Sequence, residues 1–427
     1  MLSRCARLGG FGANVTRTEV SQRGPASTDR QALTPPFRGA TVAAALETTS
    51  LEGTRRLRVG VVGCGLIAQV MHLHYLQEWR ERFEVAAVCD LAPEALAYAG
   101  DLFPDAHRLK RWEDLVAEPL DAVFVLTPGS HAPVAIAAAE AGCHVFVEKP
   151  MCFSVGEARH MIAAAEQAGV RLMVGYMKRF DPAYEELAAR LTPSEVRFAR
   201  VTTLESPLEP YVGHYPLQRG TLDPELLAEL LEDDDRRVTA AIGTDDPILR
   251  RAYRVVLLDS MVHELNAVRG VLGEPSELRF ADIWGEADGV TATLTFEAVE
   301  CVFAWIDLPG VARYEQELAF YAPDERLSLV FPSPFLRSMP TKLVLERGET
   351  GTAASWRTEK TVSYDEAFKR ELGEFYACVV EDREPRTPGQ DALRDIALAE
   401  AIIRCYEEGS PLPSPTHLEE VENRPLH

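Results

Sequence analysis

The stretch "LRVGVVGCGLIAQVMHLHYLQEW", residues 57–79, decides the fold of the first half of the chain. A short apolar run predicts a strand, two closely spaced glycines predict a turn, and apolar residues at helical spacing follow. The turn, Gly63-Cys64-Gly65-Leu66-Ile67-Ala68, has the pattern G-x-G-x-x-A, which between a strand and a helix is typical of dinucleotide binding. Gly63 permits the tight turn, Gly65 lets the backbone approach a pyrophosphate, and Ala68 allows close helix–strand packing. An ordinary strand-to-helix turn is the alternative interpretation.

The next predicted strand, "FEVAAVCD" at 83–90, ends on Asp90. An acidic residue about 20 positions after the glycine turn binds the ribose hydroxyls of a dinucleotide in this kind of fold. A carboxylate there would repel a 2′-phosphate, so Asp90 favours NAD(H), with NADP(H) as the alternative. A solvated cap for the following helix is the other interpretation of Asp90.

Strands and helices alternate as far as Tyr176. Further strands are predicted at 121–127, 143–148 and 171–176, and helices at 93–103, 132–141 and 154–169. This alternation predicts a parallel sheet with helices on both faces. The N-terminal part of the fold is therefore expected to be an α/β Rossmann domain over 57–176.

The second half has a different pattern. A helix is predicted at 182–191, a strand at 196–204 and a helix at 259–271, and four or five strands then follow one another between 277 and 331. Consecutive strands predict an α+β domain with an open antiparallel sheet over 177–410, closed by helices at 364–382 and 391–408. The acidic, Pro-rich stretch 205–250 is insertion-like, either a lid, a partner surface or a solvated insertion. Residues 411–427 are expected to form a loose tail.

Composition excludes several classes of function. The formal charge of −22 over 427 residues disfavours nucleic acid and anionic membranes as partners. No apolar run approaches the ~18 residues that a membrane helix needs. The eight cysteines include no C-x-x-C pair, which predicts a cytoplasmic protein without a metal site. Residues 1–56, rich in Arg, Ser, Thr, Gly and Pro, predict a disordered leader, with a targeting segment as the alternative.

Two segments carry candidate acid–base groups. The strand "HVFVEKP" at 144–150 ends on Lys149, one of only six lysines among the 44 Lys and Arg residues. Lys is the basic side chain whose pKa can be tuned for proton transfer. Asp259 and His263 are spaced i, i+4, so on an α-helix they share one face, and an imidazole beside a carboxylate suits proton transfer. An ordinary ion pair on a surface helix is the alternative. His72 and His74 are interpreted as surface or helix-packing residues.

Together these residues resemble the Gfo/Idh/MocA oxidoreductases, the family of glucose–fructose oxidoreductase and inositol dehydrogenase. The matching segments are the glycine turn 63–68, Asp90, "TPGSH" 127–131, "EKP" 148–150, "GYMKRFDPAY" 175–184 and "LLDSMVHELN" 257–266. The resemblance covers about 57–410. It implies a Rossmann domain followed by an α/β domain whose open sheet mediates homo-oligomerisation.

The resemblance also implies roles for single residues. Lys149 would lie beside the nicotinamide and form a proton-relay pair with His263, with either group as the base and Asp259 as the orienter of His263. Lys178 and Arg179 would bind the substrate or the cofactor, or cap the cleft. The remaining implied cofactor contacts are Leu66 and Ile67 in the glycine turn, Thr127, Pro128 and His131 along the groove, and Glu148 beside Lys149.

The predicted function is an NAD(P)-dependent dehydrogenase or reductase that acts on a CH–OH group of a sugar, cyclitol or related polyol. Two alternatives remain open at this point. The first is a redox-neutral enzyme that retains NAD and uses transient oxidation to permit elimination. The second is a sensor that binds a dinucleotide without catalysis, against which the joint presence of Lys149, Asp259 and His263 argues.

Overall fold

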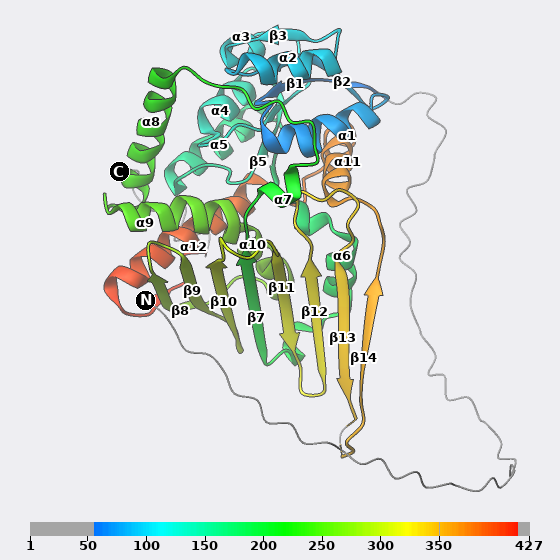
Figure 1. Cartoon of the computed structure of the whole chain (residues 1–427), viewed down its shortest axis with the longest axis vertical. Helices are drawn as coiled ribbons and strands as arrows, with labels where there is room; N and C mark the ends of the chain where they lie inside the picture. Colours follow the sequence, from blue (N-terminus) through cyan, green and yellow to red (C-terminus); the bar gives the residue numbers. More distant parts are fainter. Residues whose placement is uncertain (1–54, 350, 417–427) are drawn as a thin grey trace, which may run out of the picture. The chain divides into compact units, whose positions relative to one another are not determined.

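A six-stranded parallel sheet forms the first half of the fold, as the alternation of strands and helices predicts. In the computed structural model, which describes residues 55–349 and 351–416, its strand order is β3-β2-β1-β4-β5-β6 (Figure 1). Every pairing is parallel. The strands are β1 (Leu57–Val62), β2 (Phe83–Cys89), β3 (His107–Leu109), β4 (Ala122–Val125), β5 (His144–Glu148) and β6 (Leu172–Gly175).

Helices cover both faces of this sheet. One face packs against the π-helical turn η1 (Ala68–His72), α1 (Leu73–Glu78), α2 (Pro93–Leu102) and α11 (Ala367–Val380). The other face packs against α3 (Trp112–Val116), α4 (Ala132–Glu140), α5 (Val155–Ala168) and α12 (Gly389–Glu408). Neighbouring residues of β4 enter opposite cores, Val123 on one side and Phe124 on the other. This burial on two faces explains the continuous apolar runs in the sequence.

The second half contains a nine-stranded sheet in the order β14-β13-β12-β11-β7-β10-β9-β8-β15. Its neighbours are antiparallel except β7 and β10, which run parallel. The strands are β7 (Phe198–Glu205), β8 (Glu277–Trp284), β9 (Gly289–Phe296), β10 (Val299–Asp307), β11 (Glu315–Tyr321), β12 (Glu325–Phe331), β13 (Lys342–Gly348), β14 (Ser355–Thr361) and β15 (Leu412–Pro413).

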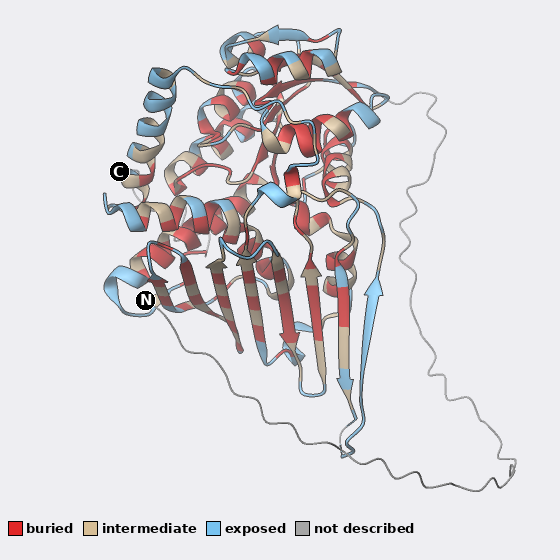
Figure 2. Cartoon of the chain, in the orientation of Figure 1, coloured by how far each residue is buried: buried red, intermediate tan, exposed pale blue. Residues whose placement is uncertain are grey.

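One face of this sheet forms the second part of the core. Buried and partly exposed residues alternate along β7 and β10, which is the pattern of strands with one covered face. The buried residues pack with α12 and with α10 (Val262–Leu272). Figure 2 shows that β14 is exposed, and so are the first turns of α8 (Pro224–Ile242). Homo-oligomerisation through the sheet stays a prediction.

The insertion-like stretch 205–250 is largely helical. It contains α7 (Glu209–Val212), α8 (Pro224–Ile242) and α9 (Pro247–Arg251). The Asp223 carboxylate caps α8 by accepting hydrogen bonds from the backbone N–H groups of Glu225 and Leu226. The chain continues through the π-helix η4 (Ala252–Met261). The remaining elements are η2 (Met177–Phe180), α6 (Pro182–Arg190) and η3 (Pro193–Glu195).

The tail was expected to be loose, and its described part is not. Leu412 and Pro413 pair with β8, and Ser414 and Thr416 are buried. The predicted leader lies outside the described residues except for Arg55 and Arg56. No helix in the described part of the chain is long and apolar enough to cross a membrane.

Candidate active site

The glycine turn has the geometry that its pattern predicts. Gly63 has a φ of +93°, and a Cβ on it would lie 2.7 Å from backbone atoms of Leu126 and Thr127, so this position requires glycine. A Cβ on Gly65, in contrast, would meet no atom within 4 Å. Ala68 is fully buried. The turn therefore closes tightly against the chain after β4 and leaves space above Gly65, where the backbone of a dinucleotide site approaches the pyrophosphate.

Asp90 supports this turn from the end of β2. One carboxylate oxygen accepts a hydrogen bond from the Cys64 N–H at 2.7 Å, and the other accepts one from the Ala92 N–H at 2.7 Å. Asp90 thus fixes the glycine turn and the chain that leads into α2. A carboxylate offers about four lone-pair sites, so both oxygens can accept further hydrogen bonds from ribose hydroxyls.

Glu148 is turned into the protein. It is buried, and one carboxylate oxygen lies 2.6 Å from His72 Nε2, while the other accepts a hydrogen bond from the Lys149 N–H at 3.0 Å. Glu148 thus supports the end of β5 from inside the protein, and its contact with a cofactor stays a prediction. His72 is fully buried, which fits the helix-packing alternative and not the surface one, and no signal in one sequence pairs it with a residue 76 positions away.

Lys149 extends from the end of β5 to the π-helix η4. Its ammonium group donates hydrogen bonds to the main-chain carbonyl of Asp259 at 2.6 Å and to the Asp259 carboxylate at 2.7 Å. Burial lowers the pKa of Lys149, but the carboxylates of Asp259 and Glu148 outweigh this effect, and the net pKa is raised above its usual value. Lys149 is therefore protonated at neutral pH.

His263 lies near Lys149, but its pKa is shifted so that the uncharged form is favoured. Burial lowers its pKa well below the usual value, and the charges of Lys178 and Lys149 lower it further. Its ring packs edge-on against Tyr176, with centroids 6.2 Å apart. The Nδ1 atom is buried without a hydrogen-bond partner among the described residues. His263 is therefore a neutral imidazole near pH 7.

Asp259 does not orient His263, which corrects the expected Asp–His pair. Asp259 lies near the end of the π-helix η4, whereas His263 lies in the first turn of the α-helix α10. Within residues 55–349 and 351–416, no hydrogen bond joins the two side chains, and the Asp259 carboxylate binds Lys149 instead.

Lys178 and Arg179 diverge although they are adjacent in the chain. Lys178 is buried, with its ammonium 5.4 Å from the centre of the Phe331 ring. Burial lowers the pKa of Lys178 to about 8, partly opposed by Glu264. Arg179 points elsewhere, donating to the Asn266 side chain at 3.1 Å and pairing with Asp391 at 3.5 Å. These contacts give Arg179 a structural role, and its binding of the substrate or the cofactor stays a prediction.

His131 connects the loop after β4 to the chain that follows β5. This side chain is buried, with its ring nitrogens 2.6 Å from the Thr127 carbonyl oxygen and 2.8 Å from the Pro150 carbonyl oxygen. Both nitrogens face the main chain, so His131 links two loops, and its contact with a cofactor stays a prediction. The Thr127 backbone lies beside Gly63, and the cofactor contacts of Thr127 and Pro128 stay predictions.

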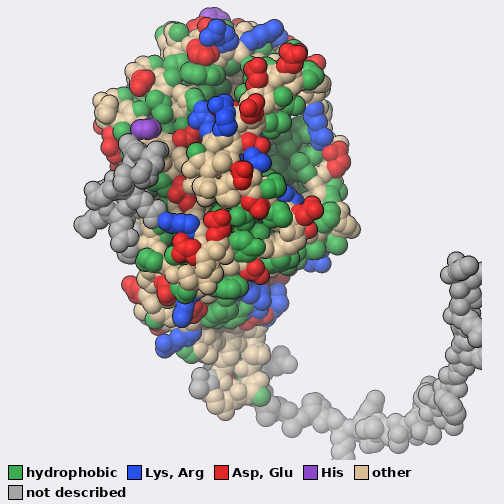
Figure 3. Space-filling view, turned by 90° about the vertical axis from the view of Figure 1, so that its left-hand side faces the viewer, with side chains coloured by type: hydrophobic (Ala, Val, Ile, Leu, Met, Phe, Trp, Pro, Cys, Tyr) green, Lys and Arg blue, Asp and Glu red, His purple; other side chains and the backbone are tan. Residues whose placement is uncertain are grey.

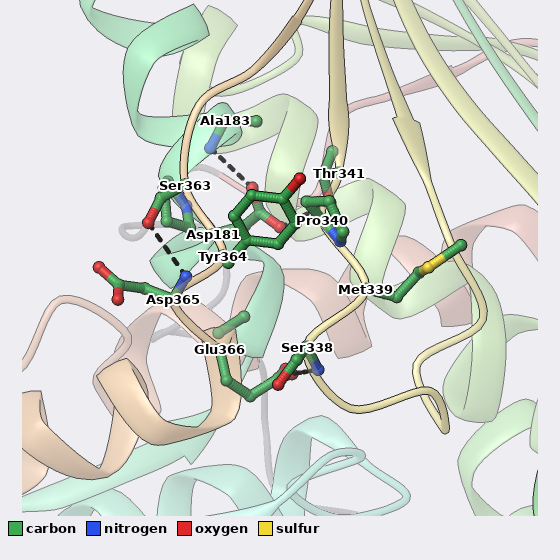
Figure 4. A pocket seen from close by; sticks show the side chains of 12 residues that line it. Asp181, Ala183, Ser338, Met339, Pro340, Thr341, Ser363, Tyr364, Asp365 and Glu366 are labelled. Carbon is green, nitrogen blue, oxygen red and sulfur yellow. Dashed lines mark hydrogen bonds between the residues drawn. The ribbon is translucent and has the colours of Figure 1, made fainter.

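A small cavity elsewhere is not part of this site. It has a volume of about 20 Å³ and lies beside the start of α6, where residues 338–341 and 363–367 meet (Figure 4). The Asp181 carboxylate on its wall accepts hydrogen bonds from Ala183 N–H at 2.7 Å and from the Thr341 hydroxyl at 2.6 Å. A space of this size holds about one water molecule. The described residues also contain no group of three or more His, Cys, Asp or Glu side chains placed to hold a metal ion.

Comparisons with known proteins agree with this geometry. A family model described as an oxidoreductase family with an NAD-binding Rossmann fold matches residues 57–176. A D-apiose dehydrogenase from Paraburkholderia graminis is 28% identical over 374 residues, which cover 83% of this chain and 89% of that protein.

Two solved structures share the fold over most of the chain. A levoglucosan dehydrogenase in complex with NADH has a TM-score of 0.65 at 18% identity, over 84% of this chain and 100% of that one. A 3-ketoreductase from Actinomadura kijaniata in complex with NADP has a TM-score of 0.61 at 20% identity, over 83% and 98%.

Proposed function

The chain belongs to the Gfo/Idh/MocA oxidoreductases, with the NAD-binding Rossmann domain at residues 57–176, and from this premise we propose a specific reaction. The protein transfers a hydride between a nicotinamide dinucleotide and a secondary alcohol or ketone of a sugar, cyclitol or related polyol. One observation carries this proposal. Lys149 and His263, from segments more than 100 residues apart, lie close together with opposite protonation states at the end of β5, which only β4 separates from β1 and its open glycine turn.

His263 and Lys149 have different roles in the transfer of the substrate proton. A bound nicotinamide supplies the hydride acceptor or donor. Oxidation of an alcohol also releases the hydroxyl proton, which a side chain must accept. His263 takes this role because its imidazole is neutral, whereas Lys149 is already protonated. The Lys149 ammonium, held by Asp259, donates a hydrogen bond to the same substrate oxygen, and in the reduction direction the proton returns from His263.

NAD(H) is the cofactor we propose first. Asp90 places a carboxylate at the end of β2, where a 2′-phosphate would be repelled. The described geometry also permits NADP(H), because the Asp90 oxygens already bind two backbone N–H groups and their charge is partly satisfied. The relatives include a structure with each cofactor.

A substrate screen tests the reaction class. Polyols, cyclitols and keto-sugars are offered with NAD(H) and NADP(H), and the nicotinamide absorbance is followed. Stoichiometric change of free cofactor supports a dehydrogenase. Product formation without net change supports the redox-neutral alternative instead. Binding of a dinucleotide with no turnover of any polyol would support the sensor.

Variants then test the roles of the residues. Lys149→Met and His263→Asn should each lower kcat by about 100-fold or more, the scale of a lost acid–base group. Dinucleotide affinity should change little in either variant. Lys110→Met, at an exposed lysine, is the matched control and should leave kcat unchanged. Near-normal turnover by either of the first two variants contradicts the assignment.

A further inference from the structure

Residues 213–223, which we call the crossing segment, connect α7 to α8 and run back to the Rossmann domain. In Figure 1 this green segment rises from α7 beside α1 and continues to the top of α8. Its apolar side chains Tyr215, Leu217 and Leu222 pack against the same core as α1 and α2. The Tyr215 hydroxyl donates to the Phe335 carbonyl at 2.8 Å. The segment is therefore anchored on both halves of the fold.

The first anchor lies beside the glycine turn. Gln69, which directly follows the G-x-G-x-x-A pattern, is buried. Its side-chain amide donates to the Gln218 carbonyl at 3.0 Å and accepts from the Gln218 N–H at 2.9 Å. The same amide nitrogen donates to the Cys64 carbonyl at 2.8 Å. One side chain thus joins the crossing segment to the turn that approaches the pyrophosphate.

Two further contacts lie on opposite sides of the sheet's carboxyl edge. A Cβ on Gly220 would lie 2.3 Å from the Ala92 Cβ, so the crossing segment touches the start of α2. A Cβ on Gly129, in the loop between β4 and α4, would lie 2.9 Å from the Asp234 carboxylate of α8. Since α2 and α4 cover opposite faces of the sheet, the chain between Gly220 and Asp234 must pass over its edge.

Ion pairs hold α8 at this place. Arg237 pairs with Glu157 at 2.6 Å, and the same Glu157 oxygen accepts a hydrogen bond from Ser130 at 3.1 Å. Arg254 pairs with Asp234 at 3.3 Å. On the side of the molecule that Figure 3 shows, acidic, basic and hydrophobic side chains are mixed. Pairing of specific charges therefore fixes α8 over the loop after β4.

We propose that the crossing segment closes the dinucleotide groove from above, so that a bound nicotinamide dinucleotide is enclosed and leaves slowly between turnovers. This inference rests on the proposed function. In such folds the dinucleotide extends along the carboxyl edge between the strands at the switch point, here β1 and β4, with its adenosine toward β2. The three contacts span that path, and the space at Gly65 remains open beneath them. Release of the cofactor then requires the Gln69–Gln218 hydrogen bonds to break.

A glycine pair provides the test. Gly220→Leu places a side chain against Ala92 and lifts the crossing segment, whereas a Cβ on Gly310 would meet no atom within 4 Å. Neither glycine has a positive φ, so Gly310→Leu is a matched control. The full-length protein is loaded with NADH and mixed with a large excess of NAD⁺, and the loss of bound nicotinamide fluorescence gives the dissociation rate.

The expected result is a dissociation rate raised at least tenfold in Gly220→Leu and unchanged in Gly310→Leu. Equal rates in Gly220→Leu and the unaltered protein overturn the inference, and so does tighter binding, which would mean that the segment obstructs the groove. Failure of the unaltered protein to bind NADH or NADPH overturns the proposed function instead.

A second pair of variants tests the same inference in case Gly220→Leu does not fold. Leu217→Ala weakens the packing of the crossing segment, while Leu227→Ala makes the same change at an exposed leucine of α8. Faster NADH release in the first variant and not in the second supports the enclosure. Equal rates in the two variants contradict it.

Discussion

Glu371 on α11 lies near Glu148, and its ionisation gives the sharpest test of how a buried charge affects stability behind the end of β5. It is fully buried, and neither carboxylate oxygen has a hydrogen-bond partner among the residues described. Burial raises its pKa well above the usual value, and the nearby Glu148 carboxylate raises it further. Since the pKa is higher in the folded than in the unfolded protein, stability is full at acid pH and is lost as the pH rises toward the folded pKa.

Glu371→Gln should remove this loss, because glutamine has nearly the same shape and cannot ionise. An unsatisfied buried polar group costs about 1–3 kcal/mol, and more when it is charged. The variant should therefore be about 1–3 kcal/mol more stable than the unaltered protein at pH 8 and nearly equal to it at pH 4. Thermal unfolding measured at several pH values between these limits gives the difference as a shift in Tm.

Glu374 on the same helix is the matched control with the opposite sign. Burial alone would raise its pKa, but two hydrogen bonds from Arg383, both 2.9 Å long, lower it below the usual value. Its contribution to stability is present above the unfolded pKa and lost as the pH falls. Glu374→Gln should therefore be destabilised at pH 8. If Glu371→Gln is also destabilised at pH 8, Glu371 is ionised and paired in the fold, and the reasoning fails.

Three further predictions concern the site. Because the pKa of His263 lies well below its ordinary 6.5, kcat/KM for alcohol oxidation should stay on its plateau at pH 6.5 and fall only in more acid solution; a midpoint at or above 6.5 contradicts this. Asp90→Asn should reduce the preference for NAD over NADP by about tenfold, since one charge is worth roughly 1–2 kcal/mol near a surface; an unchanged ratio of kcat/KM values argues against the ribose role. Gly63→Ala should lower dinucleotide affinity at least tenfold through its backbone clash, whereas Gly142→Ala, with a similar φ of +82° but open space around the Cβ, should cost only about 1–2 kcal/mol of stability.

The parallel sheet was predictable because its strands are buried on both faces and its glycine turn has a fixed spacing. Strand β14 was not, because every residue in it is exposed and its sequence has no apolar alternation. Strand β3 and helix α3 are too short, at three and five residues, to give a periodic signal. Helix α8 was not predicted, because its sequence is acidic and several of its leucines are exposed.

For the candidate site around Lys149, the sequence motifs predict the members more than their contacts. Lys149, Asp259 and His263 follow from sequence motifs, and all three lie in the corner. The contact between Lys149 and Asp259 was not predictable, since it depends on a π-helix that a sequence does not reveal. The burial of Lys178 and the outward turn of Arg179 likewise depend on packing against residues far along the chain.

The pKa values of Lys149, Lys178 and His263 depend on one another and on Asp259. Lys149 is held by a carboxylate and keeps its proton, while Lys178 forms no salt bridge with any residue that the structure describes and has a lowered pKa. Both ammonium groups act on the buried imidazole of His263, which therefore stays neutral. Environments that push the pKa values of neighbouring groups apart are what separate an acid from a base in one site. The Asp259 carboxylate thus raises the pKa of Lys149, Lys178 has no such partner among the described residues, and the charges of both lysines leave His263 neutral and able to accept a proton.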